Sequence, residues 1–204
     1  MYYTVNKDTK KNKFTDFNEI KIKKNITLLD ISNSNLTKIP NLLKFINLKT
    51  LKCNNNKLIE LCDLSKCVNL KLINCNCNKL IKLPNLTKCI NLIEIDCRFN
   101  ELVELPDLSN CVKLIHLNCN YNPLIKLPDL SKLTKLKTLY SCYNNLEKLP
   151  NLFNNKKLKS LYCCSNKLTE LPELSNCVNL IDLHCSENKL TSLSNLTKCV
   201  KLDF

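Results

Sequence analysis

The stretch NLKLINCNCNKLIKLPNLTKCI, residues 69–90, is followed directly by NLIEIDCRFNELVELPDLSNCV, residues 91–112. The two align without a gap, and cutting the chain at every 22nd residue from Asn25 gives eight such units, which begin at residues 25, 47, 69, 91, 113, 135, 157 and 179. A fixed period of this kind is the signature of an architecture in which each unit stacks on its neighbours. We therefore expect a repeat domain at residues 25–204, with eight 22-residue repeats and a truncated ninth, and a leader and cap at residues 1–24.

The consensus of the units, xLxxLxCxxNxLxxLPxLSxCV, predicts the path of the chain through each one. Apolar positions 5 and 7 alternate with polar positions 4, 6 and 8, which is the two-residue period of a half-buried strand. The leucines at positions 12, 15 and 18 are predicted to point inward from a returning arm. Proline at position 16 in six units disfavours a long helix in that arm. Ser or Thr at position 19 is predicted to cap a short turn.

The pattern LxxLxCxxNxL resembles the leucine-rich repeat, and the resemblance covers residues 25–204. It implies an α/β repeat solenoid, the leucine-rich-repeat horseshoe, with a parallel β-sheet on the concave face. The convex side is expected to be extended or 3₁₀ with little α-helix. The cysteine-bearing, Asn- and Lys-rich repeat without glycine is similar to leucine-rich-repeat proteins of giant amoeba-infecting viruses. That narrower resemblance implies a viral protein with an interaction role and brings no catalytic residues with it.

The fifteen cysteines fall mainly into two columns of the repeat. Positions 7 and 21 hold eleven of them at places where the family pattern has an aliphatic residue, so we expect these to pack as small hydrophobic groups. Cys62, Cys77, Cys142 and Cys164 lie outside the columns. Cys142 and Cys164 share position 8 on adjacent predicted strands, which leaves exposed free thiols, a disulfide or a zinc site as readings. Free thiols are favoured, because no CxxC spacing supplies a fourth zinc ligand, and we expect no metal and no cofactor.

Asparagine occupies position 10 in seven units, from Asn56 to Asn188. An amide carries both donors and acceptors, so these side chains are predicted to bridge the backbones of successive units. Asparagine also tolerates tight turn geometry, which suits a chain without glycine. In the leader, Phe14, Phe17, Ile20 and Ile22 are predicted to cover the first unit as a cap strand.

Several classes of function are disfavoured by composition. Phosphate-cradling loops and dinucleotide fingerprints require glycine, and the chain has none. The first residues contain no apolar run of the secretory type, and no stretch approaches the roughly 20 apolar residues of a membrane span. We therefore expect an intracellular, cytoplasmic protein that is not an enzyme. His116 and His184 lie three units apart, about 14 Å by strand spacing, too far to act together.

Variable side chains at positions 4, 6, 8 and 9 are predicted to form the concave face, where function is expected. Four of the six tyrosines fall on three adjacent units near the only arginine, and these residue types are enriched at interface hot spots. We predict a protein-binding site there, with no nucleic-acid partner and a monomer unless the uncapped C-terminal end pairs. The viral resemblance extends this to a host protein in host cytoplasm. The candidate binding residues are Asp96, Arg98, Phe99, His116, Tyr121, Tyr140, Tyr143, Tyr162 and His184.

The formal net charge of +13 is unevenly placed. Positions 20 to 3, the edge where the predicted strands begin, hold fourteen lysines and one acid, Asp203. Such an edge is an alternative binding site, for nucleic acid or an anionic surface. We favour a solvated edge, because aromatic side chains are not interleaved with these lysines.

Overall fold

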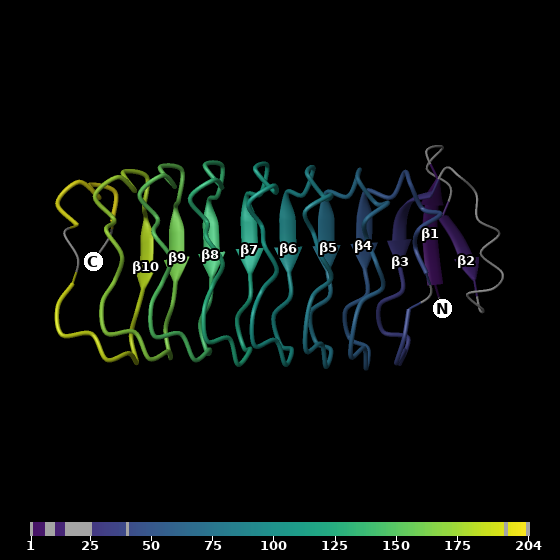
Figure 1. The fold of residues 1–204 in the computed structure, drawn as a ribbon, viewed down its shortest axis with the longest axis horizontal. Helices are drawn as coiled ribbons and strands as arrows, with labels where there is room; N and C mark the ends of the chain where they lie inside the picture. The colour runs from purple at the N-terminus through teal and green to yellow at the C-terminus, as the bar shows by residue number, and fades with distance from the viewer. Residues whose placement is uncertain (1, 7–10, 15–25, 40, 194–195, 203–204) are drawn as a thin grey trace.

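The computed structural model describes residues 2–6, 11–14, 26–39, 41–193 and 196–202. Within them ten strands form one sheet, in the order β10-β9-β8-β7-β6-β5-β4-β3-β1-β2 (Figure 1). The strands are β1 (Tyr2–Asn6), β2 (Lys11–Phe14), β3 (Ile26–Asp30), β4 (Thr50–Lys52), β5 (Leu72–Asn74), β6 (Glu94–Asp96), β7 (His116–Asn118), β8 (Thr138–Tyr140), β9 (Ser160–Tyr162) and β10 (Asp182–His184). No element in these ranges is a helix long and apolar enough to cross a bilayer.

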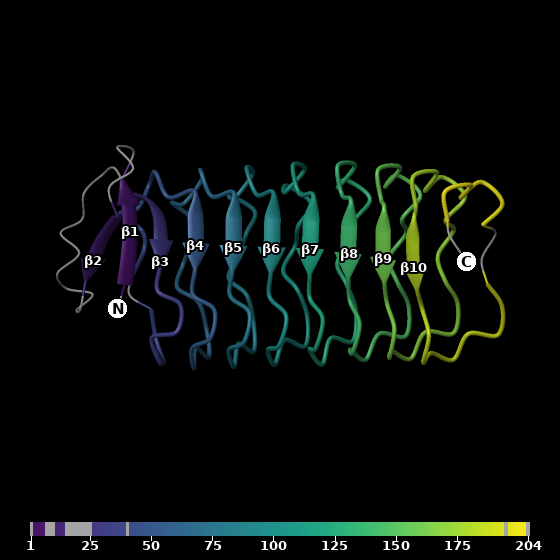
Figure 2. The ribbon, with the colours of Figure 1, turned by 180° about the vertical axis from the view of Figure 1, so that it is seen from behind.

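Strands β3 to β10 are parallel, and their register equals the period of the sequence. Leu51 lies beside Ile73 and Ile73 beside Ile95, so each position of one unit stacks on the same position of the next. Behind the sheet the chain returns through turns and bends, with no helix in the described residues, and Figure 2 shows these returning segments from the far side. The predicted leucine-rich-repeat solenoid with an extended convex side is confirmed.

The core fills the space between the sheet and the returning segments. Strands β4 to β10 each span positions 4 to 6, and the central residue points inward, as Ile73 and Leu117 do with at most 1% of their surface exposed. The predicted inward leucines of the returning segment are buried as well, for example Leu58, Leu61 and Leu64. One unit encloses little core by itself, so burial depends on the neighbouring units.

The turn in the returning segment is closed by the side chain at position 17, and not by the side chain at position 19 as predicted. Asp63 at position 17 accepts a hydrogen bond from the Ser65 backbone N–H at 2.8 Å and another from the Ser65 hydroxyl at 2.9 Å. The carboxylate therefore closes the turn and the serine donates to it, whereas the sequence suggested that the serine itself was the cap. Asp107 and Asp129 repeat the arrangement with Ser109 and Ser131.

Packing of the two cysteine columns is confirmed, with ten of the eleven side chains buried and Cys185 half-buried. The columns also use the thiol as a weak donor: Cys97 Sγ lies 3.4 Å from the carbonyl oxygen of Asn118 in the next unit. Ser141, which replaces cysteine at position 7, makes the equivalent bond to the Tyr162 carbonyl at 3.3 Å. Burial raises the pKa of the Cys89 thiol to about 11 and that of Cys119 to about 12, so these thiols stay protonated at neutral pH.

The asparagine ladder also forms as predicted. Asn100 Nδ2 donates to the carbonyl oxygens of Cys75, Cys97 and Arg98 at 3.0–3.3 Å, and its Oδ1 accepts from the Leu80 backbone N–H at 3.0 Å. One amide thus satisfies backbone groups from two units, which would otherwise be buried without partners. The expected tight turn geometry at position 10 is wrong, because the left-handed backbone conformation occurs one residue earlier, at position 9.

The first unit is covered by a strand from a different part of the leader. β1 pairs antiparallel with β3, and β2, which ends at Phe14, pairs with the outer side of β1. The strand that pairs with the first unit is therefore Tyr2–Asn6, and Phe14 of the predicted cap stretch ends β2 on its outer side. Phe17, Ile20 and Ile22 of that prediction lie outside the described residues.

Candidate binding face

The sheet has one side turned away from the core, and positions 4, 6, 8 and 9 of the units lie on or beside it. We call this surface the open face; it corresponds to the predicted concave face. Because the strands are in register, equal positions form rows that run across the sheet from unit to unit. Neighbouring strands lie about 4.8 Å apart, close to the spacing of stacked rings, so aromatic residues at one position can stack.

A first row of rings, the turn row, comes from position 9. The ring centroids of Phe99 and Tyr121 are 4.3 Å apart with an interplanar angle of 10°, and those of Tyr121 and Tyr143 are 4.3 Å apart at 7°. All three rings are exposed, between 40% and 48%. Partial desolvation and the neighbouring Tyr143 hydroxyl raise the pKa of Tyr121 above its ordinary value.

The backbone beneath the turn row is left-handed, with φ of 54° at Phe99, 55° at Tyr121 and 56° at Tyr143. It is held in place by the next unit: the Tyr121 N–H donates to the Cys142 carbonyl at 2.9 Å, and the Asn122 N–H to the Tyr143 carbonyl at 3.2 Å. The conformation costs a residue other than glycine about 1–2 kcal/mol. Asn33 and Asn55 fill the position in the first two units, and asparagine tolerates it better than an aromatic residue.

A second row, the strand row, comes from position 6 at the ends of β8, β9 and β10. Tyr140 and Tyr162 have centroids 4.8 Å apart with planes tilted by 50°, and Tyr162 and His184 have centroids 4.3 Å apart at 42°. Desolvation, together with Asp182 and Tyr140, raises the pKa of Tyr162. Six of the seven predicted aromatic and imidazole residues thus form two rows of three, and the seventh, His116, is the first residue of β7.

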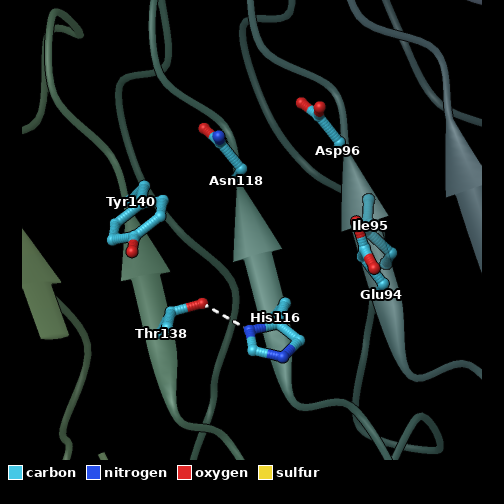
Figure 3. A pocket seen from close by; sticks show the side chains of 7 residues that line it. All are labelled: Glu94, Ile95, Asp96, His116, Asn118, Thr138 and Tyr140. Atoms are coloured by element: carbon cyan, nitrogen blue, oxygen red, sulfur yellow. Dashed lines mark hydrogen bonds between the residues drawn. The ribbon is translucent and has the colours of Figure 1, made fainter. Parts of the chain in front are cut away.

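Beside the strand row lies an open hollow of about 350 Å³ over β6, β7 and β8 (Figure 3). Three of the predicted residues, Asp96, His116 and Tyr140, line it. His116 Nδ1 and Thr138 Oγ1 share a hydrogen bond of 2.9 Å. The complete lining is Glu94, Ile95, Asp96, His116, Asn118, Thr138 and Tyr140.

The hollow is acidic, although the chain as a whole is strongly basic. Asp96 pairs with Arg98, with 3.5 Å between Oδ2 and Nε, and accepts a hydrogen bond from Asn76 Nδ2 at 2.9 Å. Glu94 makes no side-chain hydrogen bond or ion pair within the described residues. Further along the open face, Asp182 and Glu187 accept hydrogen bonds from Ser160 and Ser165. The open face from β6 to β10 therefore carries four carboxylates, Glu94, Asp96, Asp182 and Glu187, and one guanidinium, Arg98.

Cys142 and Cys164 differ from the exposed thiols expected at position 8. Cys142 is buried, with 6% exposure, while Cys164 is half-buried. The Cys164 backbone N–H donates to Cys142 Sγ at 3.2 Å, and Cys142 N–H donates to Asn120 Oδ1 at 2.7 Å. Both are free cysteines. In the described residues no group of three His, Cys, Asp or Glu side chains is placed to hold a metal ion.

Sequence reasoning missed two properties of this face. Glu94 lies on the predicted surface but was outside the candidate set, although its place at position 4 beside Asp96 already put both carboxylates on one strand. The left-handed conformation of position 9 was missed as well. The asparagines at position 9 of the first two units were the available signal, since asparagine is enriched in that conformation.

Comparisons with known proteins agree with the fold. The family described as leucine-rich repeats in two copies matches residues 156–198. Among solved structures, the leucine-rich effector protein YopM of Yersinia pestis is 32% identical over 84% of this chain, with a TM-score of 0.74. A leucine-rich repeat protein of Leptospira interrogans is 28% identical over 85%, with a TM-score of 0.76.

The functional domain of InlJ from Listeria monocytogenes, reported to include a cysteine ladder, is 25% identical over 88% of this chain and 48% of its own, with a TM-score of 0.51. The chain covers 52% of the Yersinia protein and 45% of the Leptospira protein, so it spans about half the length of these structures. No curated protein sequence matches it. In repeat pattern and in fold, the chain is a leucine-rich repeat protein.

Proposed function

We propose that this chain is a non-enzymatic scaffold that binds another protein through the open face of its sheet. Leucine-rich repeat solenoids offer extended surfaces of this kind for binding. The contact is centred on the turn row and the strand row, which hold the aromatic residues that dominate interface energetics. Arg98, Asp96 and His116 supply polar contacts at one side.

The proposal rests on position 9, where aromatic residues occupy a left-handed backbone conformation that they do not favour. Stability alone favours asparagine or glycine in a left-handed turn, yet three adjacent units place exposed aromatic residues there. Strained conformations persist where the surroundings over-determine them, and they cluster at binding and active sites. The exposed rings supply little core burial in return, so a contact with a partner is the better explanation.

The hollow indicates what the partner presents. A lysine or arginine side chain placed over β7 would lie between the Asp96 carboxylate and the Tyr140 ring, with the unpaired Glu94 beside it. Cations bind both to carboxylates and to the faces of aromatic rings. We therefore assign to the partner a segment with at least one basic residue next to apolar or aromatic ones.

The proposed location is the interior of a cell, and the partner is a protein of that compartment. All fifteen cysteines are free, which suits a reducing compartment. The compositional resemblance to leucine-rich-repeat proteins of giant amoeba-infecting viruses extends the proposal to a host protein in host cytoplasm.

Site-specific photo-crosslinking tests the assignment. A photoreactive phenylalanine analogue at Tyr140 should yield an adduct with the partner. The same analogue at Phe153 serves as a matched control, because Phe153 is also exposed, at 47%, but lies on the returning segment. Adducts from Phe153 and none from Tyr140 would place the interface elsewhere.

Affinity measurements with the captured partner complete the test. Replacing Tyr121 and Tyr143 together by Asn keeps a residue suited to the left-handed turn and removes both rings. Each interface anchor contributes about 2 kcal/mol, so the double substitution should weaken binding at least thirtyfold. Phe153→Ala should leave the dissociation constant unchanged. An unaltered dissociation constant for the double variant would refute the role of the turn row.

A further inference from the structure

The edge of the solenoid where the strands begin is built from two successive tight turns in every unit. In the second unit the Cys67 N–H donates to the Leu64 carbonyl at 2.8 Å, and the Leu70 N–H donates to the Cys67 carbonyl at 3.0 Å. Leu64, Cys67 and Leu70 are buried, so the residues between them form the tips of the two turns. The same pair of bonds recurs from the first unit to the eighth.

The second tip carries an exposed aliphatic side chain in each of the first four units. Ile46, Val68, Ile90 and Val112 occupy position 22, with exposures of 47%, 42%, 50% and 44%. Equal positions of adjacent units lie about one strand spacing apart, so these four side chains form an unbroken apolar row. Isolated exposed aliphatic residues are ordinary on protein surfaces, but a continuous row indicates an interaction site.

Lysines flank this row on both sides. Position 20, at the tip of the first turn, is lysine in units one to three. On the other side of the row, Lys49 and Lys71 occupy position 3 and Lys113 occupies position 1 of the fifth unit. The exposed lysines of this stretch are Lys44, Lys49, Lys66, Lys71, Lys88 and Lys113. We call these six lysines and the four aliphatic residues the basic turn edge.

Few carboxylates oppose these lysines. At position 17, which adjoins the first turn, units one and three carry the neutral Asn41 and Asn85. Units two and four carry Asp63 and Asp107, and both carboxylates accept hydrogen bonds from serine in their own turn. The aliphatic row therefore lies on a locally basic surface.

We propose that the basic turn edge binds the surface of a bilayer that contains anionic lipid. The lysines are attracted to the anionic headgroups within about one Debye length, about 8 Å at physiological ionic strength. The aliphatic tips enter the boundary between headgroups and acyl chains, while the long lysine side chains extend to the phosphates. The open face lies on another surface of the solenoid, so this site is independent of the proposed protein contact.

The aliphatic row favours a bilayer over nucleic acid as the ligand of the basic turn edge. A groove for single-stranded nucleic acid combines basic residues with aromatic rings on which bases stack. The basic turn edge contains no aromatic residue. It combines instead the two signals, apolar insertion and a polybasic surface, that peripheral membrane binding requires.

Sedimentation with lipid vesicles tests the proposal on the whole chain. Vesicles of phosphatidylcholine with about three-tenths phosphatidylserine should bind the protein, and vesicles of phosphatidylcholine alone should not. Raising the salt from about 0.1 M to about 1 M shortens the Debye length from about 10 Å to about 3 Å and should release most of the bound protein. Failure to bind the anionic vesicles at low salt would overturn the proposal.

Two triple variants separate the position of the lysines from the net charge of the chain. Lys66→Glu, Lys71→Glu and Lys88→Glu together should lower the partition coefficient at least tenfold. The matched control reverses Lys57, Lys79 and Lys82 instead, which changes the net charge equally at exposed positions outside the basic turn edge, and it should retain most of the binding. Equal loss in both variants would show that net charge alone drives binding, and the proposed edge would be wrong.

The apolar row has a control within the same units. Val68→Ser, Ile90→Ser and Val112→Ser should weaken vesicle binding about fivefold or more. Ile59→Ser, Ile81→Ser and Val103→Ser remove side chains of similar exposure, 54%, 49% and 52%, and should have little effect. The neighbours of these three residues are three lysines and three glutamates, Lys57, Lys79, Lys82, Glu60, Glu101 and Glu104, and not lysines alone. Circular dichroism spectra confirm that all variants fold. Binding that depends on the lysines but not on Val68, Ile90 and Val112, and that an oligonucleotide abolishes, would identify a nucleic-acid site instead.

Discussion

Tyr121 and Tyr143 stack with ring centroids 4.3 Å apart and planes within 7° of parallel, while both backbones are left-handed. The left-handed conformation costs each residue about 1–2 kcal/mol, and one stacked pair returns about 0.5–1.5 kcal/mol. For the two residues together the backbone cost is about 2–4 kcal/mol, and the stacked pair returns only part of it. Folding stability therefore does not account for tyrosine at these two positions, which leaves their identity to be set by what the rings contact.

The first prediction follows from this balance. Tyr143→Asn should change the free energy of unfolding by no more than about 1 kcal/mol in either direction, because relief of backbone strain offsets the lost stacking. Leu139→Ala, which truncates a fully buried side chain of the same unit, should cost about 2–5 kcal/mol. Denaturant titrations of both variants measure the contrast. Similar losses in the two would mean that Tyr143 is a structural residue.

The second prediction concerns the asparagine ladder. Asn100→Ala removes three donor contacts and one acceptor contact from a buried site, so it should destabilise the chain by about 3 kcal/mol or more. Asn69→Ala is the control, because the Asn69 side chain makes a single exposed bond, to the Ile46 carbonyl at 3.0 Å. It should cost less than about 1 kcal/mol. The urea midpoints of the two variants should differ accordingly.

The third prediction concerns alkaline pH. The folded chain holds the Cys111 and Cys119 thiols protonated up to a pKa of about 12, against 9.0 for a free thiol. The folded pKa values are raised, so their stabilising contribution is complete below about pH 9 and is lost as the pH rises toward 12. Each such thiol contributes a slope of up to about 1.4 kcal/mol per pH unit.

Urea unfolding at about pH 7, 9 and 10 tests this dependence. Cys119→Ser should make the decline shallower without unfolding the chain, since Ser141 already fills the same position of the next unit. A thiol reagent at neutral pH supplies a second measurement. The buried columns should react slowly in the folded chain and fully in denaturant, and rapid reaction of all eleven column thiols would contradict their burial.

The sequence predicts the strand register of this structure, but not the burial of Cys142 or the backbone conformation at position 9. The 22-residue period predicts that Leu51, Ile73 and Ile95 lie side by side, because a repeat without insertions leaves no other register. The burial of Cys142 was not predictable from alternation, since the strand ends at position 6 and the two-residue period ends with it. The conformation of position 9 was hidden because six of the eight units place residues other than asparagine there.

The two ring rows were predictable in composition but not in geometry. Register placed Tyr140 beside Tyr162, but the tilt of 50° between their rings depends on side-chain rotamers that no periodic pattern specifies. The hollow was not predictable either, because its lining combines side chains of different size from three strands, among them Asp96, Asn118 and Tyr140, whose orientations the repeat pattern does not specify. The basic turn edge was visible as a line of lysines, whereas the exposure of its valines and isoleucines was not.

The last prediction concerns Asn155, the polar amide residue at position 21, where the other units have an apolar residue or cysteine. Asn155 replaces cysteine or an aliphatic residue there, with none of its surface exposed. Its Nδ2 donates to the Leu130 and Leu133 carbonyls at 3.1 Å and 3.0 Å, but its Oδ1 has no hydrogen-bond partner among the described residues. A buried acceptor without a partner costs about 1–3 kcal/mol.

Asn155→Cys removes that acceptor and restores the group used in neighbouring units, where Cys177 Sγ lies 3.7 Å from the Leu152 carbonyl. The substitution forfeits two amide donor bonds, and it removes the unpaired acceptor and gains a weak thiol bond with better apolar packing, so the net gain should be about 1 kcal/mol. Thermal unfolding should show a higher midpoint. Ser141→Cys is the control, since the Ser141 hydroxyl already has a partner and the change should be nearly neutral. A lower midpoint for Asn155→Cys would show that the two amide donor bonds outweigh the unpaired oxygen.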